Sequence, residues 1–534
     1  MQKALRVVAA ERRLACRGNA IGRSGATITL IVLGLLFGPW GGMAVSRAAD
    51  VSFIDSTKPR LIILTDMGNE PDDSQTMVHL LMYANELDIE GLIAVSSRWL
   101  NPHRDPPKNR LYPELIEERV AAYAKVLPNL RQHADGWPDA ETLRARIAAG
   151  QPGYGMEDVG DGHASPGSEL IIRVVDRPDP RPVWIAINAG SNTLAQALWD
   201  IRKSRSPEEV RQFIAKIHIY DDAGQDNAGA WICHEFPEID WRRSYNQVFC
   251  LYGSHPEKES RAEGPYTWEP YSPDAQGQHA WAKQHIQTGH GPLGALYPDR
   301  FGRKACLEGG GTTTWIGLVN RGLYNPFRQD WGGWGGRFTR EKQLNVPAKY
   351  QPFLEEPYKP YRMYAQTGDT FTGEGITGFD RWCSEFRHAE YNPIWKWRRA
   401  YMNEFAARMD WCVQPREKAN HNPVAAFGGD MTDRIVVVTA EAGEVIDLDA
   451  RESRDPDGDP LEFCWFYYPD PGTYSGQLEP LISREAHTSF RVPRDAAGSE
   501  LHVVLQVHDR RDGDFELYDY RRVVIRVTGE QGTK

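Results

Sequence analysis

Four carboxylates lie within eight residues of one stretch, LIILTDMGNEPDD, at residues 61–73. Asp66, Glu70, Asp72 and Asp73 follow directly after a run of apolar residues. Like charges at this spacing repel one another, so a cation or a polar ligand has to offset them where they converge. Ca²⁺ is such a cation, because it takes about six to eight oxygen ligands, largely carboxylates and carbonyls. A helix cap is the alternative, but a cap accounts for one Asp, whereas the cluster indicates a metal or ligand site.

The elements around this cluster form one strand–helix–strand unit over residues 60–97. The strand RLIILTD leads into a helix, DDSQTMVHLLMYANELD, with apolar residues at helical spacing, and IEGLIAVSS forms a second strand. Similar runs recur at RPVWIAIN (181–188), SNTLAQALWDIRKS (191–204) and IAKIHIYD (214–221). This alternation predicts an α/β domain with an open, mostly parallel sheet. Ligands bind outside the carboxyl ends of the strands in such sheets, and the cluster stands at one of these ends.

Another strand-like run also ends on carboxylates, at Asp221 and Asp222. Because parallel strands end at one edge of the sheet, we expect at least one of the pair, Asp222, to face the same site. A turn role is the alternative. His163, in the loop GDGHASPG, is a further candidate for the acid that protonates a leaving group. A loop histidine that is only solvated is the alternative.

The apolar pattern changes after QPREKANHNP, a polar connector at residues 414–423. Five strand-like runs with a period of two follow between turn residues, which predicts a small β-sandwich over residues 424–530. The α/β domain then spans residues 58–413. The stretch DPDGDP (455–460) alternates carboxylates as an EF-hand loop does, but proline stands where that loop needs glycine, so a turn is the better interpretation.

Residues 1–48 have the features of a secretory signal peptide. A basic region precedes 13 apolar residues at 28–40, and SRA at 46–48 is a small-x-small cleavage pattern. An uncleaved anchor is the alternative, but a membrane span needs about 20 apolar residues. The mature chain is therefore predicted to be secreted or periplasmic, with no membrane association after cleavage of the signal.

The mature chain is strongly acidic. Without residues 1–48 it carries 55 basic and 72 acidic residues, a net charge of −17. This charge argues against nucleic acid as a partner and suits a neutral or cationic ligand. Six cysteines remain, which disulfides can pair in an oxidising compartment, although Cys464 is expected to be a buried free thiol. The absence of G-x-S-x-G, Walker A and H-E-x-x-H patterns disfavours serine hydrolases, NTPases and metalloproteases.

The stretch DMGNEPDD resembles the calcium motif of nucleoside hydrolases, D-x-D-x-G-x-D-D. It departs from that motif in two ways: Leu64 stands where the first Asp of the motif is expected, and two additional residues precede the final Asp pair. NAGSNTLA (188–195) is similar to their later motif T-G-P-L-T-N-x-A. The chain resembles more closely a family of secreted bacterial cellulose-binding proteins in which a nucleoside-hydrolase-like domain precedes an Ig-like domain. This similarity spans roughly residues 58–530 and is carried by TDMGNEPDD, PGSELIIRVV, GSNTLAQAL, EGG, WGGWGGRF, FAARMDW, DPDGDPLEFCW and GTYSG. It implies an α/β domain of nucleoside-hydrolase type and an Ig-like β-sandwich.

The resemblance also implies roles for individual residues. Asp66 and Asp73, with the backbone carbonyl of Asn188, would bind Ca²⁺. Asp72 would hydrogen-bond a sugar hydroxyl, and Asn192 would shape the sugar pocket. Asp66 would take a proton as the glycosyl bond breaks through a state resembling an oxocarbenium ion, so Asp66 and Asp72 are the predicted catalytic residues.

One segment departs from the family pattern. Where the family reads E-G-D-T-P, residues 308–314 read EGGGTTT, and Gly310 stands where the last metal-binding Asp is expected. Glu308 is the residue that would substitute for it. In WGGWGGRF, Trp334 would stack on a sugar and Arg337 would bind a hydroxyl or carboxylate, with a tight loop packed by tryptophan as the alternative.

Together these features predict an exported hydrolase of glycosyl bonds that uses a carboxylate cluster with Ca²⁺. Its substrate would be a carbohydrate or a nucleoside-like molecule, and export and the tryptophan-rich loops favour a glycan-derived one. The alternative is a carbohydrate-binding protein on the same scaffold without turnover, which Gly310 favours. A third hypothesis is a scaffold whose Ig-like domain mediates attachment.

Overall fold

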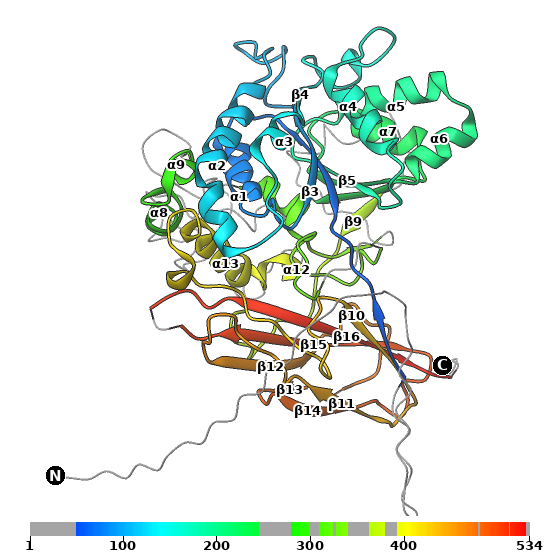
Figure 1. Ribbon diagram of the computed structural model, residues 1–534. Coiled ribbons are helices and arrows are strands. Elements are labelled where there is room, and N and C mark those ends of the chain that lie inside the picture. Colours follow the sequence, from blue (N-terminus) through cyan, green and yellow to red (C-terminus); the bar gives the residue numbers. More distant parts are fainter. Residues whose placement is uncertain are drawn as a thin grey trace, which may run out of the picture. The chain divides into compact units, whose positions relative to one another are not determined.

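A sheet organises the N-terminal domain, with helices packed around it (Figure 1). It has eight strands, in the order β4-β3-β2-β5-β6-β7-β9-β8. All neighbouring strands run parallel except β8 and β9, so the predicted open, mostly parallel sheet is confirmed. Its strands are β2 (Arg60–Thr65), β3 (Asp88–Ala94), β4 (Ile147–Ala149), β5 (Val183–Ile187), β6 (Ile217–Asp222), β7 (Asp240–Ser244), β8 (Phe338–Thr339) and β9 (Tyr364–Gln366).

The computed structural model describes residues 50–244, 279–298, 309–323, 327–339, 363–379, 392–478, 481–511 and 513–529. The predicted signal peptide and Glu308 lie outside these residues. Residues 49–534 form one compact unit. Within the described ranges, no helix combines the length and the apolar character that a membrane span requires.

Both helices predicted near the site are present, at residues 71–81 and 192–204. The first helix ends at Leu81, earlier than predicted, because from Met82 onward the backbone N–H groups bond to carbonyls three residues back. Two separate helices occupy most of residues 392–410. The α-helices are α1 (Pro71–Leu81), α2 (Pro113–His133), α3 (Ala140–Arg144), α4 (Pro166–Val175), α5 (Asn192–Ser204), α6 (Pro207–Ile214), α7 (Ala228–Glu235), α8 (His279–Ala282), α9 (Gly291–Gly294), α10 (Thr313–Ile316), α12 (Asn392–Trp395) and α13 (Arg398–Asp410).

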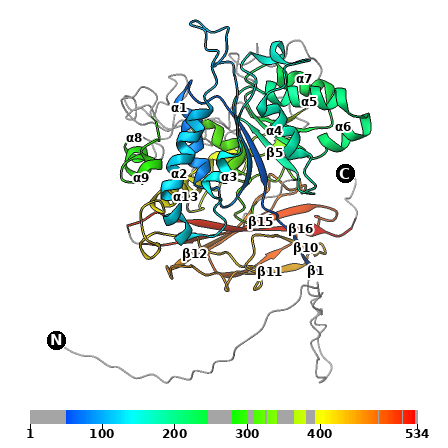
Figure 2. The ribbon, with the colours of Figure 1, turned by 45° about the horizontal axis from the view of Figure 1, so that its top comes forward.

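Helices cover both faces of the sheet (Figure 2). Leu61 and Ile63 of β2 enter one core, together with α1, α2 and α13. Ile62 and Leu64 enter the other core, together with α4, α5, α6 and α7. Successive side chains of a strand point to opposite faces, so a strand buried on both sides is apolar at every position. This explains the continuous apolar run that precedes Asp66.

The C-terminal domain is a β-sandwich, as predicted. A six-stranded sheet, in the order β1-β10-β16-β15-β12-β13, faces the pair β11-β14. The strand β1 was not predicted: it precedes the α/β domain in sequence, yet it pairs antiparallel with β10 of the sandwich (Figure 2). The strands are β1 (Asp50–Ile54), β10 (Ile435–Ala440), β11 (Val445–Asp449), β12 (Leu461–Tyr467), β13 (Ile482–Ser483), β14 (His487–Arg491), β15 (Glu500–Asp509) and β16 (Tyr518–Val527).

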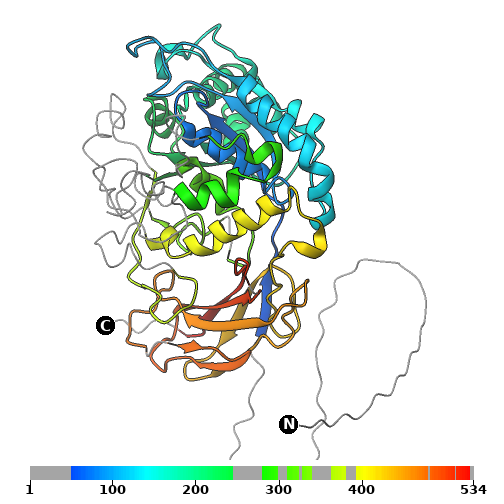
Figure 3. The same cartoon turned by 90° about the vertical axis from the view of Figure 1, so that its left-hand side faces the viewer.

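Helix α13, yellow in Figure 3, lies at the junction of the two domains. Aromatic side chains join the domains there. Trp397 meets Tyr468 and Tyr520 of the sandwich edge-on, with ring centroids 6.4 and 5.3 Å apart. These contacts are typical of a permanent interface rather than a mobile one. Several tryptophans are therefore core residues and not exposed platforms for sugars; the fully buried ones are Trp241, Trp315, Trp331, Trp395, Trp397 and Trp465.

The connector at residues 414–423 is packed against both domains. His421 Nε2 lies 3.0 Å from Nδ1 of His133, the last residue of α2. His421 Nδ1 lies 2.9 Å from Asp457 in the sandwich. The ring of Trp411 stacks on both histidines. The segment that the sequence marks as a polar connector thus fixes the two domains to each other.

A buried histidine makes the stability of the sandwich depend on pH. His502 of β15 is fully buried, and Arg522 Nη1 donates to its Nδ1 at 3.1 Å, so the ring is neutral with its proton on Nε2 toward Glu500. Burial lowers the pKa of His502 to about 4, against about 6.5 in the unfolded chain. Between these values the unfolded chain binds more protons. We therefore expect the free energy of unfolding to fall by up to about 3 kcal/mol as the pH drops from about 6.5 to about 4.

Urea unfolding of wild type and His502→Gln across this range tests the prediction. Glutamine can still accept the hydrogen bond from Arg522 but does not titrate, so the variant should show a flatter dependence on pH. Equal slopes for both proteins would contradict the role of His502.

Candidate functional site

The carboxyl ends of four neighbouring strands, β3, β2, β5 and β6, meet at one edge of the sheet. Backbone hydrogen bonds of 2.9 Å, from Asn188 N to Leu64 O and from Val95 N to Thr65 O, hold these ends together. The residues at the four ends are polar: Ser96 and Ser97 after β3, Asp66 after β2, Asn188 after β5 and Asp222 at the end of β6.

Asp66 and Asp73 form the buried centre of this edge, at 6% and 5% exposure. Ser97 Oγ donates a hydrogen bond to Asp66 Oδ2, and Thr65 Oγ1 donates one to Asp73 Oδ1. Burial raises the pKa of Asp66. Burial, together with the charges of Asp66 and Asp72, raises the pKa of Asp73 well above its usual range. The fold holds these carboxylates together against their repulsion, which is typical of a functional site.

The start of α1 places the remaining members of the cluster. Glu70 is the N-cap residue, but its side chain does not cap the helix. Asp72 lies half-buried in the first turn, where the helix dipole favours negative charge. Asp73 lies in the same turn and bonds to Thr65 of β2 instead of capping the helix. A capping role therefore does not account for Asp73.

Asn188 links the strand ends to a segment far downstream. Its Oδ1 accepts a hydrogen bond from Thr314 Oγ1 at 2.8 Å, and its backbone carbonyl accepts one from Gln225 Nε2 at 2.7 Å. A Cβ added to Gly311 would lie 2.5 Å from Asn188 Nδ2, so the close approach requires glycine. The segment GGGTTT at 309–314 therefore borders the site, and it contains no carboxylate.

Asn192, the first residue of α5, is positioned by Asp226, a carboxylate that the sequence analysis did not single out. Asp226 accepts from the backbone N–H groups of Ser191, Asn192 and Ala228 at 2.9, 3.1 and 3.0 Å. It therefore holds the starts of α5 and α7 together. Asn192 Nδ2 donates to Ser96 Oγ at 3.0 Å. The signal for Asp226 in the sequence was an aspartate just before a helix.

The two carboxylates that end β6 have different surroundings. Asp221 is buried, pairs with Arg243 Nε at 2.6 Å and accepts from Trp241, so its role is structural. Asp222 is half-buried. Burial and the charges of Asp221 and Asp66 raise its pKa well above the usual range. Asp222 ends β6, which β5 separates from β2 and Asp66, and its role in the site stays a prediction.

Residues 60–338 contain all of these side chains and match the family model described as cellulose-binding Sde182, nucleoside hydrolase-like domain. Residues 445–527 match the C-terminal domain of the cellulose-binding protein Sde0182. The chain belongs to this family. The resemblance seen in the sequence is thereby confirmed for both domains.

A solved structure agrees with this assignment to the Sde182 family. It is a nucleoside hydrolase-related hypothetical protein from Saccharophagus degradans that is associated with carbohydrate metabolism. It is 35% identical, with a TM-score of 0.72 over 88% of this chain and 100% of that chain, which confirms the fold. The effector protein XOO4466 aligns at 12% identity over 46% of this chain and 65% of that chain, and its TM-score of 0.24 carries no argument. No curated protein matches the chain.

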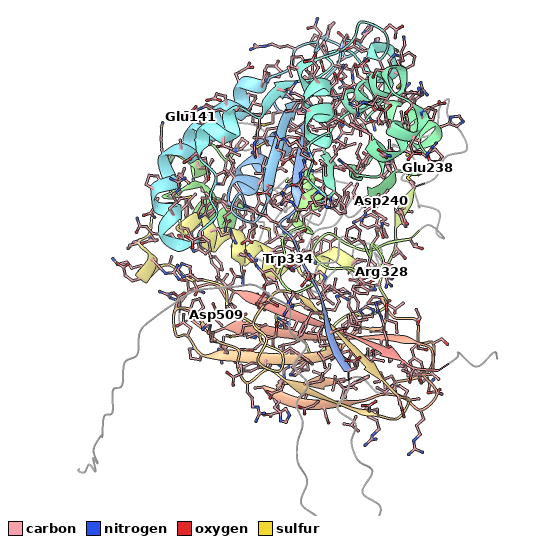
Figure 4. All side chains as sticks on the ribbon, turned by 45° about the vertical axis from the view of Figure 1, so that its right-hand side comes forward. Glu141, Glu238, Asp240, Arg328, Trp334 and Asp509 are labelled. Atoms are coloured by element: carbon pink, nitrogen blue, oxygen red, sulfur yellow. The ribbon has the colours of Figure 1, made fainter. Side chains whose placement is uncertain are left out.

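In this member of the Sde182 family, the WGGWGGRF loop packs against the sandwich. Trp334 is 3% exposed and lies where the two domains meet (Figure 4). Arg337 Nε pairs with Asp369 at 2.6 Å, and Arg522 of the sandwich donates to Gly332 O at 3.0 Å. Trp334 does not fit its predicted role of stacking on a sugar, because its ring is buried. Arg337 does not fit its predicted role of binding a ligand, because it is already paired with Asp369. The alternative of a tight, packed loop accounts for both.

Two further predictions concern His163 and Cys464. His163 Nδ1 lies 2.9 Å from Asp158 Oδ1 on an exposed loop, and its role as an acid stays a prediction. Cys464 is a buried free thiol, as predicted, and so are Cys233 and Cys412. The other three cysteines of the mature chain lie outside the described residues.

The oxygen atoms at the strand ends suit a hard cation such as Ca²⁺. Asp66 and Asp73 supply carboxylates. Asn192 Oδ1 and Gln225 Oε1 are buried amide oxygens with no hydrogen-bond partner in the described part of the chain. Carboxylates together with neutral oxygens are the ligands that Ca²⁺ prefers in proteins. The residues present therefore fit the ion that the Sde182 family's resemblance to nucleoside hydrolases implies.

Two groups of three ligand residues lie in the sandwich, each with ligand atoms within 4.8 Å of one another. They are Asp447, Asp449 and His487, and Asp455, Asp457 and Asp459. In the second group the backbone N–H groups of Asp457 and Asp459 donate to Asp455 Oδ1 at 2.8 and 3.1 Å. These bonds form the turn predicted for DPDGDP, so the group has a structural explanation.

Proposed function

We propose that this protein is an exported hydrolase of glycosyl bonds that acts on a carbohydrate or a nucleoside-like molecule. The observation that carries the proposal is the buried pair of carboxylates, Asp66 and Asp73, at the carboxyl ends of the parallel strands, where burial raises the pKa of both. Such a site favours positive charge, and glycosyl-bond cleavage passes through a state resembling an oxocarbenium ion. The cellulose-binding family supports a carbohydrate ligand, and residues 1–48 support secretion or a periplasmic location.

The side chains suggest a division of roles. Ser97 fixes the carboxylate of Asp66, which then takes the proton of a water molecule as the glycosyl bond breaks. Asp72 binds a sugar hydroxyl from the first turn of α1, while Asn192 and Asp222 line the pocket. Asp66, Asp73 and the Asn188 carbonyl would hold Ca²⁺, whose charge would offset the carboxylates and make water in the site more acidic.

The second candidate is a carbohydrate-binding protein without turnover. The segment at 309–314 favours it, because glycines and threonines border the site there and Gly310 provides no carboxylate. The substitute role of Glu308 stays a prediction, since that residue lies outside the described ranges. Proteins that share a scaffold can differ in whether they bind or cleave a ligand, so a measurement of released product has to distinguish the two candidates.

Product release from the mature protein tests the proposal. Wild type and Asp66→Asn are incubated with nucleosides and with a panel of plant and microbial glycans, in the presence of Ca²⁺. We expect wild type to release sugar or base, and the variant to release it at least about a hundredfold more slowly, the usual contribution of a positioned base. Asp139→Asn, at an exposed carboxylate, is the matched control and should resemble wild type. Retention of wild type on cellulose without product from any substrate would contradict hydrolysis and support the binding alternative.

A further inference from the structure

The side-chain amide of Gln225, at the edge of the site, has one atom that is hydrogen-bonded and one that is not. Its Nε2 donates to the backbone carbonyl of Asn188 at 2.7 Å. Its Oε1 is buried and has no hydrogen-bond partner in the described part of the chain. Exchanging the two amide atoms would turn Oε1 toward the Asn188 oxygen, so that two acceptors would face each other. The hydrogen bond therefore fixes the orientation of Gln225, and the unpaired oxygen is a property of the fold.

The backbone just before Gln225 is strained, and this strained turn sets the direction of the Gln225 side chain. Ala223 has a φ of 63°, and among the described residues it is the one non-glycine residue with a positive φ. Gly224 follows with a φ of 65°. Hydrogen bonds from Ala223 N to Ser244 O and from Gly224 N to Asp221 Oδ1 hold this turn. Strain of this kind persists where the surrounding structure imposes it, and it is concentrated at functional sites. Here it turns the chain directly between Asp222 and Gln225.

A second unpaired oxygen has the same character. Asn192 is fully buried, and its Nδ2 is occupied by Ser96 Oγ, whereas its Oδ1 has no partner among the described residues. Unpaired buried acceptors are uncommon, and each calls for a ligand, an ion or a water molecule. These two neutral oxygens accompany the crowded carboxylates at the strand ends.

We infer that Gln225 Oε1 is a neutral oxygen ligand for the cation that Asp66 and Asp73 hold, an assignment that rests on the proposed function. A neutral amide adds a ligand atom without adding to the repulsion among the carboxylates, which already includes Asp222. The segment at 309–314 brings hydroxyl groups and backbone but no carboxylate, so the remaining ligands have to come from elsewhere. Gln225 supplies one from the loop after β6.

Titration of the mature protein with Ca²⁺ alone, followed by calorimetry, tests this assignment. Gln225→Met keeps the length of the side chain and removes the oxygen, so we expect the affinity for Ca²⁺ to fall at least about tenfold. Gln225→Glu places a further charge at the same position, so it should enlarge the rise in Tm that Ca²⁺ produces. Gln212→Met, on the exposed face of α6, is the matched control and should bind Ca²⁺ as wild type does. Melting without Ca²⁺ verifies that each variant folds.

The outcomes separate this assignment from the proposed function. If Asp73→Asn loses Ca²⁺ binding while Gln225→Met retains the wild-type affinity, the cation site stands and Gln225 is not one of its ligands. If wild type binds no Ca²⁺, the assignment of Gln225 is overturned as well. Hydrolysis is judged independently, by product release from wild type in the presence of a chelator.

Discussion

Replacing Asp369 with alanine lowers the free energy of unfolding by about 3–5 kcal/mol, the cost expected when one partner of a buried ion pair is removed. The Asp369 side chain is fully buried. Lys396 Nζ donates to it at 2.5 Å and Arg337 Nε at 2.6 Å, and the Tyr468 hydroxyl donates a third hydrogen bond. Burial by itself raises the pKa of a carboxyl group, but the charges of Lys396 and Arg337 lower that of Asp369. Without Asp369, the buried Lys396 and the half-buried Arg337 lose their counter-charge.

Urea unfolding of the variant, followed by circular dichroism, measures this loss. Glu208→Ala is the control, because it breaks an exposed ion pair with Arg211 and should change the free energy of unfolding by no more than about 1 kcal/mol. Asp369→Asn keeps the shape and loses only the charge, so its effect should lie between the other two. A loss in Asp369→Ala as small as that of the control would show that the network contributes little to stability.

The strand ends that form the site were predictable because burial on both faces leaves a clear pattern. A strand of a two-sided parallel sheet is apolar throughout, so a carboxylate marks its end, as Asp66 and Asp222 do. The order of the strands then brings Asn188 between them. The separate roles of Asp221 and Asp222 were less predictable. They differ because Arg243, which comes from another strand, pairs with Asp221.

The junction between the domains was not predictable in the same way. The glycines of WGGWGGRF indicate a close approach of the backbone, but not which surface approaches it. Trp331 Nε1 meets Glu500 Oε1 at 3.2 Å, and these residues are 169 positions apart. The pairing of β1 with β10 spans an even longer stretch, and the five residues of β1 are largely exposed, so the alternation that marks a buried strand is missing. Contacts between distant segments leave no local pattern in the sequence.

Asp73→Asn is expected to change stability and function in opposite directions. Asparagine keeps an oxygen to accept the hydrogen bond from Thr65, and it removes the repulsion with Asp66 and Asp72. In a chelator we expect the free energy of unfolding to rise by about 1–2 kcal/mol, the gain typical of relieving an unfavourable arrangement at a functional site. In the presence of Ca²⁺ and a cleaved substrate, turnover should fall at least about a hundredfold, because the variant holds the cation poorly.

Chemical denaturation with and without Ca²⁺ gives the sign of each effect, and Asp139→Asn controls for the substitution itself. Ca²⁺ at a hundred times its Kd stabilises wild type by about 2.7 kcal/mol if it binds only the folded state, and it should stabilise Asp73→Asn much less. Destabilisation of Asp73→Asn in the chelator would mean that the fold already compensates the charge of Asp73. A purely structural carboxylate loses stability when it is neutralised, as Asp369 should, whereas a carboxylate kept for a ligand gains it. The comparison of Asp73 with Asp369 therefore separates a binding site from a structural ion pair within one protein.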